Sequence, residues 1–113
     1  MSTIINNRKT GNIDKSGSCA IIVLLVDDIC YVANVGDSRA IMSTDGGKLA
    51  FNLSRDHKPS DIREQDRILS AGGKIYRTEM TKLDNQKDKI IGPLRILPGK
   101  LSVSRTLGDI EAK

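Results

Sequence analysis

The chain of 113 residues is long enough for one domain with a modest core, and its 38% hydrophobic and 28% charged residues are typical of a globular protein. The net charge of +4 comes from Lys and Arg residues spread among Asp and Glu, with 3% aromatic residues, unlike the basic stacking surface of a nucleic-acid binder. The longest apolar run, residues 20–26, is too short to cross a bilayer. We therefore expect neither nucleic acid nor a membrane as a partner.

Residues 1–15 are polar and are expected to form a poorly ordered lead-in to a domain at residues 16–113. They lack the apolar segment of a secretory signal, so we expect an intracellular, cytoplasmic protein. Cys19 and Cys30 are the only cysteines, and the single histidine, His57, cannot complete a usual zinc site with them. Buried free thiols are expected, with a disulfide between neighbouring strands as the alternative.

The first half of the chain predicts an antiparallel meander of four strands. The run at residues 18–26 is almost continuously apolar, which suits a strand covered on both faces. Asp27 and Asp28 make the first turn, and the Asp45-Gly46 pair signals a hairpin further on. Such a sheet needs another layer to cover it. The predicted strands are at residues 18–26, 29–35, 39–43 and 49–53.

One helix is expected from Pro59 onward. Asp61 is a suitable N-cap residue, and Glu64 three residues later completes the pattern of a capping box. Gly72 marks the end of the helix. Its charged face is expected to include Glu64, and its buried stripe is expected to consist of Ile62, Ile68 and Leu69.

The segment after the helix is expected to be mostly exposed. Residues 74–77 favour a short strand, and residues 78–89 read as a polar excursion. Pro93 and Pro98 stiffen the chain that follows. Residues 101–104 alternate apolar and polar side chains, which favours another short strand.

Five short blocks carry the strongest functional signal. By itself, the turn at Gly36 with the polar residues after it is also compatible with a solvated hairpin turn. In their order and spacing, however, the blocks resemble the metal-dependent protein serine/threonine phosphatases, the PPM-type or type 2C family, over about residues 14–113. The blocks are Ser16-Gly17-Ser18-Cys19-Ala20, the stretch at 29–40 with Gly36-Asp37-Ser38-Arg39, Ser54-Arg55-Asp56-His57-Lys58-Pro59, Ala71-Gly72-Gly73, and Leu101-Ser102-Val103-Ser104-Arg105-Thr106-Leu107-Gly108-Asp109.

The resemblance implies an α/β (α+β) fold that is part of a four-layer α-β-β-α sandwich, with antiparallel sheets, one main helix and a flap at about residues 74–100. It also implies hydrolysis of phosphoserine and phosphothreonine, with a phosphorylated protein as substrate. In this family two divalent ions, Mg or Mn, bind between aspartates and activate a water molecule. Oxygen ligands suit these hard ions.

The family's metal-binding blocks are not recognisable in this sequence. Asp45-Gly46 lies in a hairpin signal, and Asp84-Asn85 lies in the polar excursion without the neighbouring motif. We therefore expect the chain to be a central fragment of the phosphatase domain and to be inactive alone. No catalytic residue is assigned, and a complementing chain is a candidate partner.

Asp56 is the one residue that the resemblance assigns to a metal, as a ligand of an accessory ion. The alternative is that Asp56 only caps the turn before the helix. His57 matches the same block and is expected to fix the corner between strand and helix. Residues expected to support the site structurally are Gly36, Asp37, Arg39, Arg105 and Asp109.

Arg105 and Asp109 are further expected to make a buried polar pairing, as an Arg near a turn commonly binds a carboxylate. The alternative to a structural role is that Arg39 or Arg105 binds the phosphate group. A rival function of another class also stands. The chain could be a non-catalytic, phosphatase-like protein-binding module that docks through its flap or through an open sheet edge.

Overall fold

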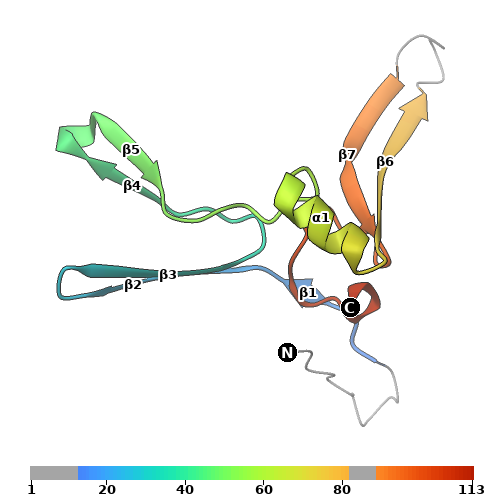
Figure 1. Ribbon diagram of the computed structural model, residues 1–113, viewed down its shortest axis with the longest axis horizontal. Coiled ribbons are helices and arrows are strands. Elements are labelled where there is room, and N and C mark those ends of the chain that lie inside the picture. Colours follow the sequence, from blue (N-terminus) through green and yellow to red (C-terminus); the bar gives the residue numbers. More distant parts are fainter. Residues whose placement is uncertain (1–12, 82–88) are drawn as a thin grey trace.

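The computed structural model describes residues 13–81 and 89–113 and arranges several hairpins around one helix (Figure 1). In these residues the chain forms eight strands, paired in antiparallel twos, and one α-helix. The predicted α+β class is confirmed, and the strand pairs are consistent with part of an α-β-β-α sandwich. The elements are β1 (Gly17–Ser18), β2 (Ala20–Val26), β3 (Ile29–Val35), β4 (Ile41–Thr44), β5 (Leu49–Asn52), α1 (Ile62–Ser70), β6 (Lys74–Thr81), β7 (Lys89–Leu97) and β8 (Leu107–Gly108).

The predicted meander is wrong, because the first strands form two separate hairpins. β2 pairs with β3 from Ala20↔Val35 to Val26↔Ile29, and β4 pairs with β5, but β3 does not pair with β4. Figure 1 shows the two hairpins diverging from a common base. The backbone of Gly36, just after β3, bonds to His57 instead of to a neighbouring strand, and this turn sends β4 in another direction.

The β2–β3 hairpin exposes apolar side chains on both of its faces. Alternate residues of β2 point to opposite faces, yet Ile22, Val23 and Leu25 are 60%, 47% and 73% exposed. Cys19 and Cys30 are both free thiols. Cys19 is half-buried, but Cys30 lies exposed on this hairpin, so the prediction of burial is wrong for Cys30.

Helix α1 begins at Ile62, not at Pro59, which is fully buried in the preceding turn. Asp61 is the N-cap as predicted, since its carboxylate accepts a hydrogen bond of 2.9 Å from the Arg63 amide. Of the residues predicted to form the buried stripe of the helix, only Ile68 is buried, at 6% exposure. Ile62 and Leu69 are exposed. Glu64 is 7% exposed and shares the buried line of the helix with Ile68, one turn away. No helix in the described part of the chain is long and apolar enough to cross a membrane.

The expected flap is a hairpin of β6 and β7, which makes the predicted strand at 74–77 longer than expected. Its register shifts between Arg77↔Leu94 and Glu79↔Ile91, so that β7 has one extra residue there. That position includes Pro93, which has no N–H to give to the ladder. The excursion predicted at 78–89 falls mainly on residues 82–88, which lie outside the described residues.

The predicted strand at 101–104 is reduced to one bridge, in which the Ile96 amide donates to the Leu101 carbonyl at 2.9 Å. Around it lies the hub, which we define as residues 53–73 and 96–108. The hub contains the buried apolar residues Ile68 and Ile96 and the fully buried Pro59. The radius of gyration is 18.5 Å, against about 13 Å for a compact domain of this length. The hairpins therefore extend outward from a small core.

Candidate functional site

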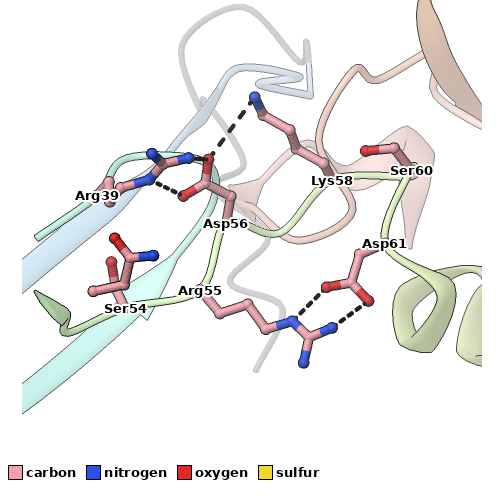
Figure 2. A pocket seen from close by; sticks show the side chains of 8 residues that line it. Arg39, Ser54, Arg55, Asp56, Lys58, Ser60 and Asp61 are labelled. Carbon is pink, nitrogen blue, oxygen red and sulfur yellow. Dashed lines mark hydrogen bonds and ion pairs between the residues drawn. The ribbon is translucent and has the colours of Figure 1, made fainter.

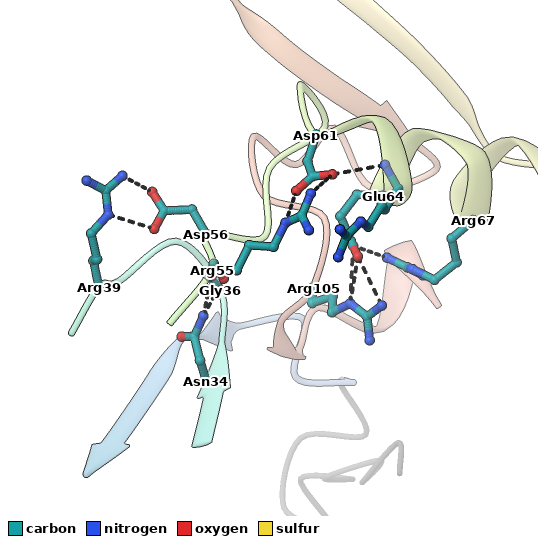
Figure 3. Close-up of polar contacts among 10 residues, drawn as sticks. Asn34, Gly36, Arg39, Arg55, Asp56, Asp61, Glu64, Arg67 and Arg105 are labelled. Atoms are coloured by element: carbon teal, nitrogen blue, oxygen red, sulfur yellow. Dashed lines mark hydrogen bonds and ion pairs between the residues drawn. The ribbon is translucent and has the colours of Figure 1, made fainter. Parts of the chain in front are cut away.

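The turn at Gly36, which Figure 3 shows beside Asn34, is fixed by two hydrogen bonds to His57. The Gly36 amide donates to Nδ1 of His57 at 3.1 Å, and the Gly36 carbonyl accepts from the His57 amide at 2.9 Å. Gly36 has φ +114°, and a Cβ atom there would overlap Sγ of Cys19 and lie 2.6 Å from its Cβ. Only glycine suits this position, and the role of His57 in fixing the corner is confirmed.

The same corner joins blocks that are distant in the sequence. Nδ2 of Asn34 donates to the Arg55 carbonyl at 2.8 Å, and the His57 carbonyl accepts from the Ser104 amide at 2.9 Å. At the other end of the hub, Gly17 pairs with Gly108, and the Asp109 amide donates to Ser16 at 2.9 Å. The first and last blocks of the sequence therefore lie side by side, which sequence spacing did not predict.

Arg39 and Asp56 form a bidentate ion pair on the other side of the corner. Nε and Nη2 of Arg39 lie 3.1 and 2.8 Å from the two Asp56 carboxylate oxygens. The Lys58 ammonium lies 3.8 Å from one of these oxygens. The hydrogen bond from Arg39 lowers the pKa of Asp56 against the opposing effect of burial, and the same bond raises the pKa of Arg39. Asp56 is therefore held as a carboxylate.

These residues line an open cleft of about 450 Å³, which we call the corner cleft (Figure 2). A second bidentate pair crosses it, because the Arg55 guanidinium donates to both oxygens of Asp61, with Nη2 at 2.7 Å from Oδ1. Bonding to Arg55 is the main cause of the lowered pKa of Asp61. The corner cleft is lined by Arg39, Asn52, Ser54, Arg55, Asp56, Lys58, Ser60 and Asp61.

Glu64 is the centre of a third polar cluster, at the buried side of α1. Its carboxylate accepts from Nη2 of Arg67 at 2.8 Å and from Nη2 of Arg105 at 3.0 Å. Arg67 also donates to the Ser104 carbonyl at 2.7 Å, which ties the helix to the last block. Burial raises the pKa of Glu64, but the hydrogen bonds from Arg105 and Arg67 outweigh it and lower that pKa to about 2.

The predicted pairing of Arg105 with Asp109 is therefore wrong, since Arg105 pairs with Glu64 and its side chain is 47% exposed. The sequence placed Glu64 in a capping box and on the polar face of the helix. Its position one turn before the buried Ile68 was the available signal for a buried carboxylate. Asp109 instead lies with φ +45° beside Gly17, where a Cβ atom would overlap the Asp109 carboxylate.

A metal centre needs several converging oxygen ligands. Within residues 13–81 and 89–113, no group of three or more His, Cys, Asp or Glu side chains could hold a metal ion. Asp56 offers one carboxylate, and both of its oxygens already bind the Arg39 guanidinium beside Lys58. These residues do not fit a two-metal centre by themselves, and any ion at Asp56 needs further carboxylates.

Comparison with known proteins identifies the relatives of this arrangement. A sequence profile described as Protein phosphatase 2C matches residues 2–113. The chain is 39% identical over 98 residues to "Probable protein phosphatase 2C 60" of Arabidopsis thaliana, covering 87% of this chain and 22% of the relative. It is 38% identical over 98 residues to "Probable protein phosphatase 2C 6" of Paramecium tetraurelia, covering 87% and 27%.

A third relative, "Putative protein phosphatase 2C 22" of Oryza sativa subsp. japonica, is 41% identical over 96 residues, covering 83% of this chain and 16% of the relative. No solved structure matches the chain. The chain thus spans between 16% and 27% of the length of these three relatives. Because the family profile matches residues 2–113, nearly the whole sequence, the chain belongs to the protein phosphatase 2C family.

Proposed function

We propose that the chain is part of an intracellular, cytoplasmic, metal-dependent protein phosphatase that hydrolyses phosphoserine and phosphothreonine in proteins. The family match over residues 2–113 is the observation that supports this activity. The convergence of the sequence blocks on one hub adds support, because the residues that carry the resemblance contact one another. Mg or Mn is the proposed cofactor of the complete domain, since both are hard ions that prefer oxygen ligands.

In this proposal the chain supplies support and one candidate ligand, not a catalytic centre. Gly36, Arg39 and Arg105 hold the corner and the helix in place through the contacts described above. Asp56, an ionised carboxylate at the edge of the corner cleft, is the proposed ligand of an accessory ion. Because the described residues include no metal-binding group of three, we expect the 113 residues alone to be inactive.

The alternative is a non-catalytic, phosphatase-like module that binds another protein. The apolar side chains exposed on both faces of the β2–β3 hairpin favour it, since large exposed apolar patches commonly mark interaction sites. In that case the chain would bind a partner, or a complementing chain, without turning over a phosphorylated substrate.

The test compares the isolated chain with a longer protein that contains it, using a phosphothreonine peptide and Mn. We expect no turnover above buffer from the chain alone and metal-dependent hydrolysis by the longer protein. Phosphatase activity of the isolated chain would contradict the expected inactivity. Inactivity of the longer protein with partner binding intact would favour the binding module.

Three variants of the longer protein separate the two interpretations of Asp56. Asp56→Asn removes the charge of the proposed ligand, whereas Arg39→Gln keeps the Asp56 carboxylate and removes only the arginine that pairs with it. Asp66→Asn is a matched control on the exposed face of α1. If Asp56 binds an ion, only Asp56→Asn should raise the Mn concentration needed for half-maximal activity. Equal changes in Asp56→Asn and Arg39→Gln would mean that Asp56 acts through the ion pair alone.

A further inference from the structure

A second cleft adjoins the corner cleft, and we call it the flap cleft because the β6–β7 hairpin forms one of its walls. It has a volume of about 360 Å³ and shares Lys58 and Ser60 with the corner cleft. Lys58 and Ser60 therefore lie between the two clefts and contribute to both. The flap cleft is lined by Asp37, Lys58, Pro59, Ser60, Arg77, Pro93, Leu94 and Ser102.

The cations that line the two clefts differ in how fully neighbouring carboxylates neutralise them. In the corner cleft, Arg39 and Arg55 each hold a carboxylate by two hydrogen bonds. In the flap cleft, Lys58 is 3.8 Å from its nearest carboxylate oxygen, and Arg77 has no ion pair with any described residue. Both side chains are exposed, so the flap cleft holds the two cations that remain available to a ligand.

Hydroxyl groups and one acid complete the polar lining of the flap cleft. Ser60 and Ser102 are exposed, and neither makes a hydrogen bond to another residue that the structure describes. Asp37 is the one acidic side chain lining this cleft, so its two cations and one anion leave a net charge of +1. This balance favours a single anionic group that accepts hydrogen bonds from the two hydroxyls.

The walls of the flap cleft are held by well-anchored backbone. Pro59, which is fully buried, lines the cleft between Lys58 and Ser60. Arg77 lies opposite Leu94 on the β6–β7 hairpin, directly before the register shift that includes Pro93. A bulge of this kind bends and twists a hairpin locally, which sets the direction of the side chains beside it.

We propose that the flap cleft binds an anionic side chain of the phosphoprotein substrate, at a position other than the phosphoresidue that is hydrolysed. This proposal rests on the proposed phosphatase function, because it assigns substrate recognition to Lys58 and Arg77. The two cations attract the anionic group, and the hydroxyls of Ser60 and Ser102 donate to it. The group is either a carboxylate or a second phosphate, which share this chemistry.

Binding can be tested apart from catalysis with three fluorescent peptides of equal length and an unmodified threonine at the centre. Their flanking residues are Glu, phosphoserine or Gln, and fluorescence anisotropy reports binding to the full 113-residue chain without metal. At about 0.05 M salt we expect the two anionic peptides to bind up to about fivefold more tightly than the Gln peptide. At about 1 M salt this advantage should disappear, because exposed charges are then screened.

Substitutions of the charged residues that line the flap cleft test whether the anionic peptides bind there. Arg77→Gln and Lys58→Gln should each remove most of the advantage of the anionic peptides, whereas Asp37→Asn should increase it. Arg63→Gln on α1 and Lys48→Gln in the β4–β5 turn are matched controls, because both residues are exposed and line neither cleft. Circular dichroism spectra should be unchanged in all five variants.

The three peptides also separate the two sources of the anionic group. A greater advantage for phosphoserine than for Glu would assign the cleft to a second phosphate, and the reverse order would assign it to acidic residues. Equal binding of all three peptides, or equal losses in the Lys48 and Arg63 variants, would overturn the proposal. Because no hydrolysis is measured, this failure is distinct from failure of the proposed phosphatase activity.

Discussion

The hub and the β2–β3 hairpin are built in opposite ways. In the hub, Glu64 and Ile68 are buried at 7% and 6% exposure, and the Glu64 carboxylate is bonded to two arginines. In the hairpin, Leu25 is 73% exposed, although it lies in the most apolar run of the chain. The hub therefore pairs its buried carboxylate within this chain, although the buried Ser104 hydroxyl has no hydrogen-bond partner among the described residues. The hairpin leaves its apolar side chains uncovered.

The difference shows which part of the structure the sequence blocks specify. Gly36, His57 and Ser104 come from three different blocks, and His57 in the hub bonds to both Gly36 and Ser104. The hairpin instead follows from backbone pairing and β-propensity alone, without a covering layer. A strand that is apolar on both faces is normally covered on both, so the hairpin carries the greater risk of association.

The largest expected effect comes from Gly36→Val, which should unfold the hub. The variant would force a β-branched residue into φ +114° and drive its Cβ into Cys19, while Gly36 holds both bonds to His57. We expect the free energy of unfolding to fall by about 3 kcal/mol or more. Urea unfolding followed by circular dichroism measures this change.

Gly47→Val is the control, because Gly47 also has a positive φ, +90°, but has open space where the side chain would lie. It should cost the strain of the backbone without the steric clash, and so should destabilise the chain less than Gly36→Val does. Equal effects of the two variants would show that the turn at Gly36 depends on backbone conformation and not on its contact with Cys19.

The next effect is that of Glu64→Gln, which leaves Arg67 and Arg105 without their carboxylate. Removing one partner of a buried ion pair commonly costs about 3–5 kcal/mol. Since both arginines are partly exposed here, at 44% and 47% of their side chains, we expect about 2 kcal/mol. Asp66→Asn, on the exposed face of α1, removes one carboxylate charge and is the comparison in the same unfolding measurement.

The pH dependence of the destabilisation caused by Glu64→Gln independently tests whether it comes from the lost ion pairs. The pKa of Glu64 is lowered from 4.5 to about 2 in the folded chain. A carboxyl with a lowered pKa stabilises the fold at pH values above its unfolded pKa, and loses that contribution as the pH falls toward its folded pKa. The difference in the free energy of unfolding between the native chain and Glu64→Gln should therefore be constant above about pH 5. It should disappear as the pH falls from about 4.5 to about 2. A difference that persists at pH 2 would argue against the ion pairs as its source.

Loss of the helix cap should have a smaller effect. Asp61→Ala removes the bond to the Arg63 amide and the pairing with Arg55, and should lower the folding equilibrium constant by about fivefold. Asp61→Ser keeps a capping oxygen but loses the ion pair, and it should recover most of the stability. If Asp61→Ser is as unstable as Asp61→Ala, the pairing with Arg55 matters more than the cap.

Much of this architecture follows from local sequence signals. The turn at Gly36, the cap at Asp61, the hairpin at Asp45-Gly46 and the antiparallel pairing of the strands are each encoded by a few adjacent residues. Local backbone preferences determine such features, so they can be read without knowing the fold.

The failures of prediction concern contacts between distant segments. Arg105 pairs with Glu64, 41 residues away, and not with the nearby Asp109. Ile62 and Leu69 have helical spacing suited to burial, but no described element covers them. Hydrophobic periodicity indicates which face a helix can bury, whereas actual burial depends on what packs against that face. The flap cleft could likewise not be predicted from the sequence, because Lys58 and Arg77 are 19 residues apart and line the same cleft only in the folded chain.

The smallest effect is expected from truncating an apolar side chain of the exposed hairpin. Leu25→Ala should change the free energy of unfolding by no more than about 0.5 kcal/mol, because Leu25 is 73% exposed in β2. Ile96→Ala is the matched variant in β7, and burial to 7% exposure should make its cost about 2–5 kcal/mol. Leu25→Ala should also reduce self-association at high concentration, measured by light scattering, because it removes exposed apolar surface. If Leu25→Ala destabilises the chain as much as Ile96→Ala, then the hairpin is covered in solution, and the contrast between hub and hairpin is lost.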